Sequence, residues 1–206
     1  MPEFLVFRLV APYSSFGAVA VGERRPTWDR PSKSQILGLV ACALGIERTE
    51  EERHFELTRA HLFAVRVDDA GRVQSDYHTS QVPPQRRNRR FATRADELAV
   101  DKTELKTILS RRENRLGAFY SIALATKGNA GSAPSLATIA DALRTPVFVP
   151  FAGRKANALM LPMSPEIVSA DDVEAAFVAF DARESPEQKD LRRRLWLGPQ
   201  PDTLPR

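Results

Sequence analysis

The sequence predicts an α+β fold in which an antiparallel sheet carries helices on one face. Two observations predict it. Segments rich in strand-forming residues alternate with segments of helical periodicity, and hydrophobic residues make up 43% of the 206 positions, which is enough for a real core. The length fits one domain of moderate size, or one domain with an appendage.

The N-terminal part predicts a strand followed by a well-marked helix. Residues 3–10 are rich in strand formers and predict a central first strand. Further on, Ser32 and Gln35 have the spacing of a capping box, and Gly45 is placed to end a helix. Apolar residues recur with helical spacing between them, so we expect a helix at about 32–45.

The next segments predict a second helix and a β-hairpin. Three acids would lie in the first turn of a helix at about 49–59, with Thr49 as its N-cap. Residues 61–68 and 72–78 are rich in strand formers, and a turn with glycine lies between them. We therefore expect these two strands to pair with each other.

The segment at about 79–116 interrupts this pattern. Five arginines and no acid lie between Thr79 and Ala95, and apolar periodicity is weak. Such a segment cannot build a core by itself, so we expect an excursion from the main domain. The positive charges of this segment repel one another and favour binding to a polyanion. A solvated loop without a ligand would have the same composition.

Regular structure returns after the excursion. Residues 117–126 predict a strong strand, and 135–144 have the pattern of an amphipathic helix. Prolines keep 145–155 extended. A short amphipathic helix is predicted at 171–180, and a last strand at 192–197.

The resulting order is β-α-α-β-β-excursion-β-α, which approximates a ferredoxin-like unit. We expect a main domain at 1–165, with the excursion at about 79–116 inserted in it. Residues 166–206 would form a C-terminal appendage.

Charge and composition exclude several classes of protein. The net charge is +4, and 24 of the 30 basic residues are arginines, which suit bidentate phosphate contacts. A GC-rich genome would raise the arginine content whatever the function. Cys42 is the single cysteine, so no internal disulfide or zinc cluster is expected. No signal peptide and no long apolar run is recognisable, which predicts a soluble, cytoplasmic protein.

Two segments have the chemistry of a phosphate site. Three cations and three hydroxyls surround the predicted start of the helix at 32–45, where backbone N–H groups are free. An ordinary capped helix with a solvated basic segment is the alternative. Gly153, Arg154 and Lys155 are the second candidate, because glycine permits close approach and two cations suit a phosphate. A simple turn with exposed charges would look the same.

Seven short segments follow one another in a specific order and spacing: Arg8–Gly17, Arg25–Thr27, Pro31–Ser34, Gly38–Leu39, Gly45–Ile46, Asp76–Thr79 and Thr145–Lys155. Together they resemble the CasD family, whose members are subunits of type I-E CRISPR Cascade complexes. The resemblance runs from about residue 1 to about residue 165. It implies a modified RNA-recognition fold in which the excursion is an inserted thumb. The family continues past the end of this chain, so we expect the appendage to be incomplete.

The resemblance also implies a function. The chain would be a non-catalytic Cascade subunit that binds the 5′ handle of the CRISPR RNA (crRNA) and caps the backbone of the complex at that end. Its partners would be the crRNA, the backbone subunit and the large subunit, with target DNA bound only through the complex. No cofactor, metal or membrane is expected. The expected RNA contacts are Phe16, Arg25, Thr27, Arg30, Ser32, Lys33, Ser34, His78, Arg86, Arg87, Arg89, Arg90, Arg154 and Lys155.

Catalysis is the alternative, with the chain as a metal-independent endoribonuclease that processes the crRNA precursor. His78 is the one candidate among three histidines, and Tyr77 is its neighbour. Adjacent side chains of a strand point to opposite faces, so the two would not converge on one phosphate. We therefore expect His78 to be a structural or RNA-contacting residue. The sequence also leaves two roles for Phe16: its ring would either stack on a base or lie in the core.

Overall fold

The computed structural model describes residues 1–17, 20, 22–85, 90–128 and 131–184. Three of the predicted RNA contacts, Arg86, Arg87 and Arg89, lie outside these residues, as does the strand predicted at 192–197. Within the described part, none of the helices combines the length and the apolar character that crossing a bilayer requires.

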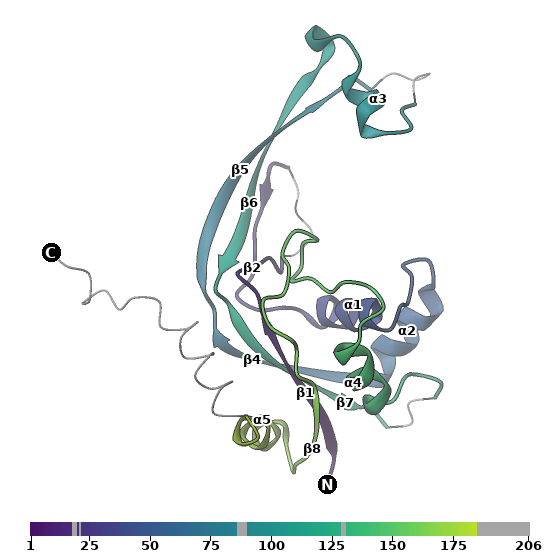
Figure 1. Cartoon of the computed structure of the whole chain (residues 1–206), viewed down its shortest axis with the longest axis vertical. Coiled ribbons are helices and arrows are strands. Elements are labelled where there is room, and N and C mark those ends of the chain that lie inside the picture. The colour runs from purple at the N-terminus through teal and green to yellow at the C-terminus, as the bar shows by residue number, and fades with distance from the viewer. Residues whose placement is uncertain (18–19, 21, 86–89, 129–130, 185–206) are drawn as a thin grey trace, which may run out of the picture.

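The main sheet has four antiparallel strands in the order β4-β7-β1-β8 (Figure 1). They are β1 (Glu3–Val10), β4 (His61–Asp69), β7 (Phe119–Thr126) and β8 (Glu166–Ser169). The first three confirm predicted strands. β8 was not predicted, because four residues are too few to show a clear period. It pairs with β1 at the edge of the sheet, although it falls within the predicted appendage.

Three helices cover one face of this sheet: α1 (Lys33–Ala43), α2 (Glu51–Ala60) and α4 (Leu136–Arg144). Their buried apolar side chains pack with alternate residues of β1 and β7 in one core. All three helices confirm the sequence prediction. The N-cap of α2 is Glu50 rather than Thr49. The Glu50 carboxylate accepts the backbone N–H of Glu47 at 2.7 Å, which stabilises the turn before the helix.

The opposite face of the sheet is covered by α5 (Val173–Ala182), which confirms the predicted C-terminal helix. Its apolar residues pack against a second cluster that includes Val6 of β1, Ala123 of β7 and Val168 of β8. The end of the helix also brings carboxylates to this face of the sheet. Both faces of the main sheet are therefore covered.

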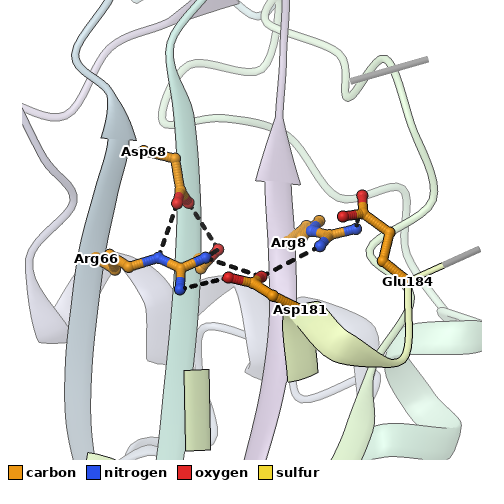
Figure 2. Close-up of polar contacts among 6 residues, drawn as sticks. Arg8, Arg66, Asp68, Asp181 and Glu184 are labelled. Carbon is orange, nitrogen blue, oxygen red and sulfur yellow. Dashed lines mark hydrogen bonds and ion pairs between the residues drawn. The ribbon is translucent and has the colours of Figure 1, made fainter. Parts of the chain in front are cut away.

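Figure 2 shows an ionic network between this helix and the sheet. Asp181 accepts hydrogen bonds from Arg66 at 2.8 and 3.0 Å and lies 3.4 Å from Arg8. Arg8 also pairs with Glu184 at 2.6 Å, and Arg66 pairs with Asp68 at 2.7 Å. The two arginines therefore tie strands β1 and β4 to the end of α5.

A long two-stranded arm leaves the main sheet (Figure 1). It consists of β5 (Arg72–Val82) and β6 (Lys106–Leu116), which pair along their whole length. The predicted pairing of 61–68 with 72–78 is therefore wrong. Instead β4 pairs with β7, and β5 pairs with β6; at the turn between β4 and β5, Gly71 lies so close to Leu116 O that a Cβ there would overlap it.

The remaining elements complete the arm. Two short strands, β2 (Tyr13–Ser14) and β3 (Arg24–Arg25), pair with β6 near its root. At the far end lie α3 (Arg94–Leu98) and a 3₁₀ turn at Lys102–Glu104. The arm is thus anchored by strands at one end only.

Candidate nucleic-acid interface

Four segments that are far apart in the sequence meet beside the root of the arm. They are the loop 13–17, the basic segment 24–28, the loop 152–157 and strand β6. The backbone N–H of Ser15 donates to Ala152 O at 3.1 Å, and that of Trp28 donates to Phe16 O at 2.7 Å. We call this region the loop junction. It brings together both stretches that the sequence marked as phosphate sites.

Glu113 of β6 holds the basic segment in place. Arg24 donates to Glu113 Oε1 at 3.1 and 2.8 Å, and the backbone N–H of Thr27 donates to Oε2 at 3.3 Å. The Glu113 side chain is 13% exposed. The Arg24 guanidinium is the main cause of a lowered pKa at this carboxyl, which favours the charged form that the contact needs.

Two glycines allow the loops to pack this closely. A Cβ at Gly17 would overlap Pro26 O, and a Cβ at Gly153 would overlap Ser15 O. Gly153 also has φ +87°, which other residues rarely adopt. The expectation that Gly153 lets the backbone approach a ligand is therefore corrected, since the close approach here is to the chain itself.

Three arginines gather on one side of the junction. Arg25 of β3 and Arg112 of β6 lie opposite each other in the strand pair. Arg154 donates to the backbone oxygen of Arg25 at 3.3 Å. Burial lowers the pKa of Arg154, and the guanidinium groups of Arg112 and Arg25 lower it further. We call these three residues the arm-root cluster. Like charges held this close are unfavourable alone and favour an anionic ligand such as phosphate.

Arg112 was not among the predicted contacts. In the sequence, the Arg111–Arg112 pair looks like part of the polar excursion. Its place at the junction follows only from the pairing of β6 with β5 and β3. The incorrect hairpin therefore concealed this residue.

The start of α1 lies against the same loops. Gln35 Nε2 donates to Gly17 O at 3.1 Å, while its Oε1 accepts the Ser32 backbone N–H at 2.8 Å. The Ser32 and Ser34 hydroxyls are hydrogen-bonded to each other at 3.1 Å. No acid lies in the first turn of the helix. Its free N–H groups therefore add to the positive potential of the junction.

Three predicted cations of the junction remain available to a ligand. Lys33 is half-buried, and Lys155 is exposed; neither has a hydrogen bond or ion pair with another described residue. Arg30 is exposed and lies 3.7 Å from Asp29, a weak surface pair.

Two other predicted contacts serve the fold instead. Phe16 is 2% exposed and packs edge to face on Tyr120, with ring centroids 5.7 Å apart. Thr27 is buried, and its Oγ1 accepts the Phe16 backbone N–H at 3.0 Å. Neither side chain can reach a base in this conformation: Phe16 lies in the core, the second of its two expected places, and the expected RNA contact of Thr27 is corrected. Sequence spacing does not distinguish a loop aromatic in the core from one at the surface.

His78 lies on the arm, on the same face as Arg112. Its Nε2 is 2.6 Å from Asp76 Oδ2, and Asp76 is the register partner of Arg112. Tyr77 points to the opposite face, as alternation along a strand requires. In the described residues, no group of three or more His, Cys, Asp or Glu side chains could hold a metal ion. The structure thus does not bring Tyr77 and His78 together.

The arm tip is separate from the junction. Of the four arginines predicted there, Arg90 is the one within the described residues, and it is exposed. Helix α3, which begins four residues later, lies at the far end of the arm from α1 (Figure 1). The one described contact of the tip, Arg90, is therefore separate from the contacts of the junction, as the predicted excursion implies.

Comparisons with known proteins match this architecture. The model of a family described as CRISPR-associated protein (Cas_Cas5) matches residues 4–198. The CRISPR system Cascade subunit CasD of Escherichia coli (strain K12) is 28% identical over 189 residues, which cover 88% of this chain and 78% of that protein.

Two solved structures are also similar. A chain of a CRISPR RNA-guided surveillance complex has a TM-score of 0.59 and 29% identity, over 84% of this chain and 66% of that one. The match thus spans just under two thirds of that chain. A chain from a crystal structure of a Cas protein has a TM-score of 0.50 and 24% identity, over 84% and 69% of the two chains. The mixed α+β fold with antiparallel sheets is therefore one found in Cas proteins.

Proposed function

Because the chain belongs to the CRISPR-associated protein (Cas_Cas5) family, we propose that it is a non-catalytic subunit of a type I-E-like Cascade complex that binds the 5′ handle of the crRNA. The observation that carries the proposal is the arm-root cluster. The guanidinium groups of Arg25 and Arg112 lie close enough to Arg154 to lower its pKa, and the start of α1 bonds to Gly17 O in the same junction. Phosphate groups of a single strand are the ligand that this arrangement suits.

The fold is assigned to the ferredoxin-like class, as a modified RNA-recognition fold. The support is the strand order β4-β7-β1-β8 with helices α1 and α4 on one face. Many RNA-recognition sheets stack bases on the open face, but here α5 covers that face. We therefore assign the RNA to the loop junction. One main domain carries the arm as an insertion, and the segment at about 79–116 is its thumb.

The handle would be held by its phosphates and read by its bases. Arg25, Arg112 and Arg154 contact phosphates, and Lys33 and the start of α1 add to the same field. Bases splayed from the strand would be read on their edges by neighbouring side chains and backbone groups. His78 lies on the face of Arg112 and is assigned as a further contact.

The partners follow from the family. The chain would cap the backbone of the complex at the 5′ end of the crRNA and contact the adjacent backbone subunit and the large subunit. The arm tip, including Arg90, is assigned to the backbone subunit and the adjacent RNA. Target DNA would be bound only through the complex, in the cytoplasm.

A second candidate is a metal-independent endoribonuclease that processes the crRNA precursor. It is favoured by the contact between His78 and Asp76, since a carboxylate can orient a catalytic imidazole. Strand cleavage also needs a proton moved at a second oxygen and a stabilised phosphorane. Tyr77 would have to supply one of these from the opposite face of the arm. We therefore place this candidate second.

One incubation separates the candidates. Purified protein is mixed with labelled repeat RNA in EDTA and analysed by filter retention and denaturing gel. Retention without cleavage is the expected result, and Arg112→Glu should lower the affinity by about 10- to 100-fold, because a charge-assisted contact is replaced by repulsion. Arg48→Glu, an exposed cation between α1 and α2, is the matched control and should leave the affinity unchanged.

The other outcomes are equally clear. Cleavage that is lost in His78→Ala would establish the endoribonuclease. Neither retention nor cleavage would leave a protein scaffold without direct RNA contact. An equal loss of affinity in Arg48→Glu and Arg112→Glu would show that the arm-root cluster has no special role.

A further inference from the structure

The guanidinium group of Arg154 is held by uncharged oxygen atoms. Its Nη1 donates to Glu113 O and to Asn114 Oδ1, each at 2.9 Å, and its Nη2 donates to Arg25 O at 3.3 Å. Two of these acceptors are backbone carbonyl oxygens, and the third belongs to a neutral amide. The three bonds therefore fix the orientation of the guanidinium without compensating its charge.

The carboxylate beside Arg154 is engaged elsewhere. Glu113 accepts hydrogen bonds from the Arg24 side chain and from the backbone N–H of Thr27. The arginines under α5 are, by contrast, paired directly with carboxylates. Burial lowers the pKa of Arg154, and the neighbouring guanidinium groups lower it further, as expected for a cation that has no anion of its own.

A second amide fixes the first. Asn157 is 8% exposed, and its Nδ2 donates to Asn114 Oδ1 at 3.4 Å and to Ala152 O at 3.3 Å. Its backbone N–H also donates to Arg154 O at 2.8 Å. Donors from Arg154 and Asn157 thus meet at one oxygen, which sets the orientation of the Asn114 amide. We call Asn114 and Asn157 the amide pair.

A neutral amide has a specific advantage at the position of Asn114. A carboxylate there would form a salt bridge with Arg154 and compete with a phosphate for it. An apolar side chain would remove an acceptor and leave the long arginine side chain more rotamers. The amide orders the guanidinium before a ligand arrives and leaves its charge available, which is the condition for a preorganised phosphate contact.

We propose that Asn114 is a positioning residue of the handle site, which together with Asn157 holds the Arg154 guanidinium by neutral contacts and so leaves its charge to a phosphate of the RNA. The proposal rests on the proposed function, because it needs the handle at the arm-root cluster. Asn114 acts through Arg154 and does not itself have to touch the RNA.

The test measures the affinity of purified variants for labelled repeat RNA over a range of salt concentrations. Asn114→Ala should lower the affinity about 3- to 10-fold, because Arg154 loses one acceptor, and leave the slope of log affinity against log salt unchanged. Asn114→Asp should lower the affinity further and make the slope shallower by about 0.7, the contribution of one phosphate contact of a single strand. A purely structural role would not change this slope.

A double-mutant cycle tests the route of the effect. In a protein that carries Arg154→Ala, adding Asn114→Ala should cause no further loss of affinity, because the residue through which Asn114 acts is already absent. Gln74→Glu is the matched control, since Gln74 is exposed and is the β5 register partner of Asn114. It adds a carboxylate on the same face but outside the amide pair, and should leave the slope close to that of the wild type.

Contrary results are distinguishable from one another. Wild-type affinity in both Asn114 variants, or additive losses in the cycle, would overturn the positioning role. An equal change of slope in Gln74→Glu would replace it with general repulsion between carboxylates and RNA. Asn114→Asp keeps the size of the side chain, so it decides the question even if Asn114→Ala fails to fold. A wild-type protein that does not retain the RNA would instead remove the proposed function.

Discussion

At Gly153 the backbone has φ +87°, and a side chain there would overlap the carbonyl oxygen of Ser15. This residue stands directly before Arg154, which bonds to Glu113 O and Asn114 Oδ1 at 2.9 Å. The glycine thus fixes where the arginine enters the junction. A residue next to a candidate ligand contact can in this way act on the site through the fold.

We expect Gly153→Ala to destabilise the protein by roughly 2–3 kcal/mol, because it combines left-handed strain with a backbone overlap. Thermal or urea unfolding measures the change. Gly117→Ala is the matched control: Gly117 has φ +66°, but a Cβ there meets nothing within 4 Å. It should cost about 1 kcal/mol, the strain alone. Equal losses in both variants would contradict the close packing at Ser15.

Single residues were predictable from the sequence where the signal is local. Ser32, Gln35 and Gly45 mark the limits of α1 through hydrogen bonds and dihedral angles within a few positions. The sequence left the place of Phe16 open and predicted Thr27 as an RNA contact, because the burial of both residues depends on β7 and on the junction. Burial of a loop residue is a property of distant packing and leaves no local pattern.

The same contrast holds for elements. Helices α1, α4 and α5 were predicted because periodicity and caps lie inside each segment. Strand β5 was predicted with the wrong partner, because strand pairing is decided by segments far away in the chain. Residues 106–116 contain arginines and asparagine, and their strand character appears only when they pair with β5.

The arm tip can be removed to test its independence from the main sheet. Residues 83–105 would be replaced by an Asn-Gly turn, which joins the paired residues Val82 and Lys106. We expect the melting temperature to change by only a few degrees, because the tip lies away from both hydrophobic clusters of the sheet. Copurification with the other subunits should be lost, since the tip is assigned to the backbone subunit.

The outcome for this variant distinguishes two roles. Loss of folding would show that the tip stabilises the main domain, contrary to the separation seen in Figure 1. Normal assembly with the complex would instead show that the backbone subunit is bound elsewhere. A variant that folds should still bind the isolated handle, because the arm-root cluster is left intact.

In the whole molecule, the main sheet and the arm differ in how their faces are covered. The sheet is closed on one side by α1 and α4 and on the other by α5. The arm leaves its two faces open. Arg8 and Arg66 are paired with carboxylates under α5, whereas Arg25, Arg112 and Arg154 at the arm root form no ion pair with another described residue. Binding and stability should therefore respond to different substitutions.

Asp181→Ala tests this separation. Asp181 joins Arg8 and Arg66 to α5, and its loss leaves two arginines with incomplete pairing, one of them only 10% exposed. Removing one partner of a buried pair costs about 3–5 kcal/mol, and since the Asp181 side chain is 31% exposed, we expect a smaller loss of about 2 kcal/mol in urea unfolding. Asp171→Ala, an exposed acid just before the same helix, should change stability by less than about 0.5 kcal/mol.

The decisive readout for Asp181→Ala is RNA affinity under conditions where the variant is still folded. If the handle lies at the loop junction, affinity should equal that of the wild type, because no contact of the network reaches Arg25, Arg112 or Arg154. A folded variant that binds more weakly would make the α5 side of the sheet part of the RNA site. A variant that binds more tightly would mean that the carboxylate of Asp181 competes with phosphate for Arg8 and Arg66. Unchanged binding with lower stability would place RNA recognition in the arm and the loop junction, and leave the covered sheet as their support.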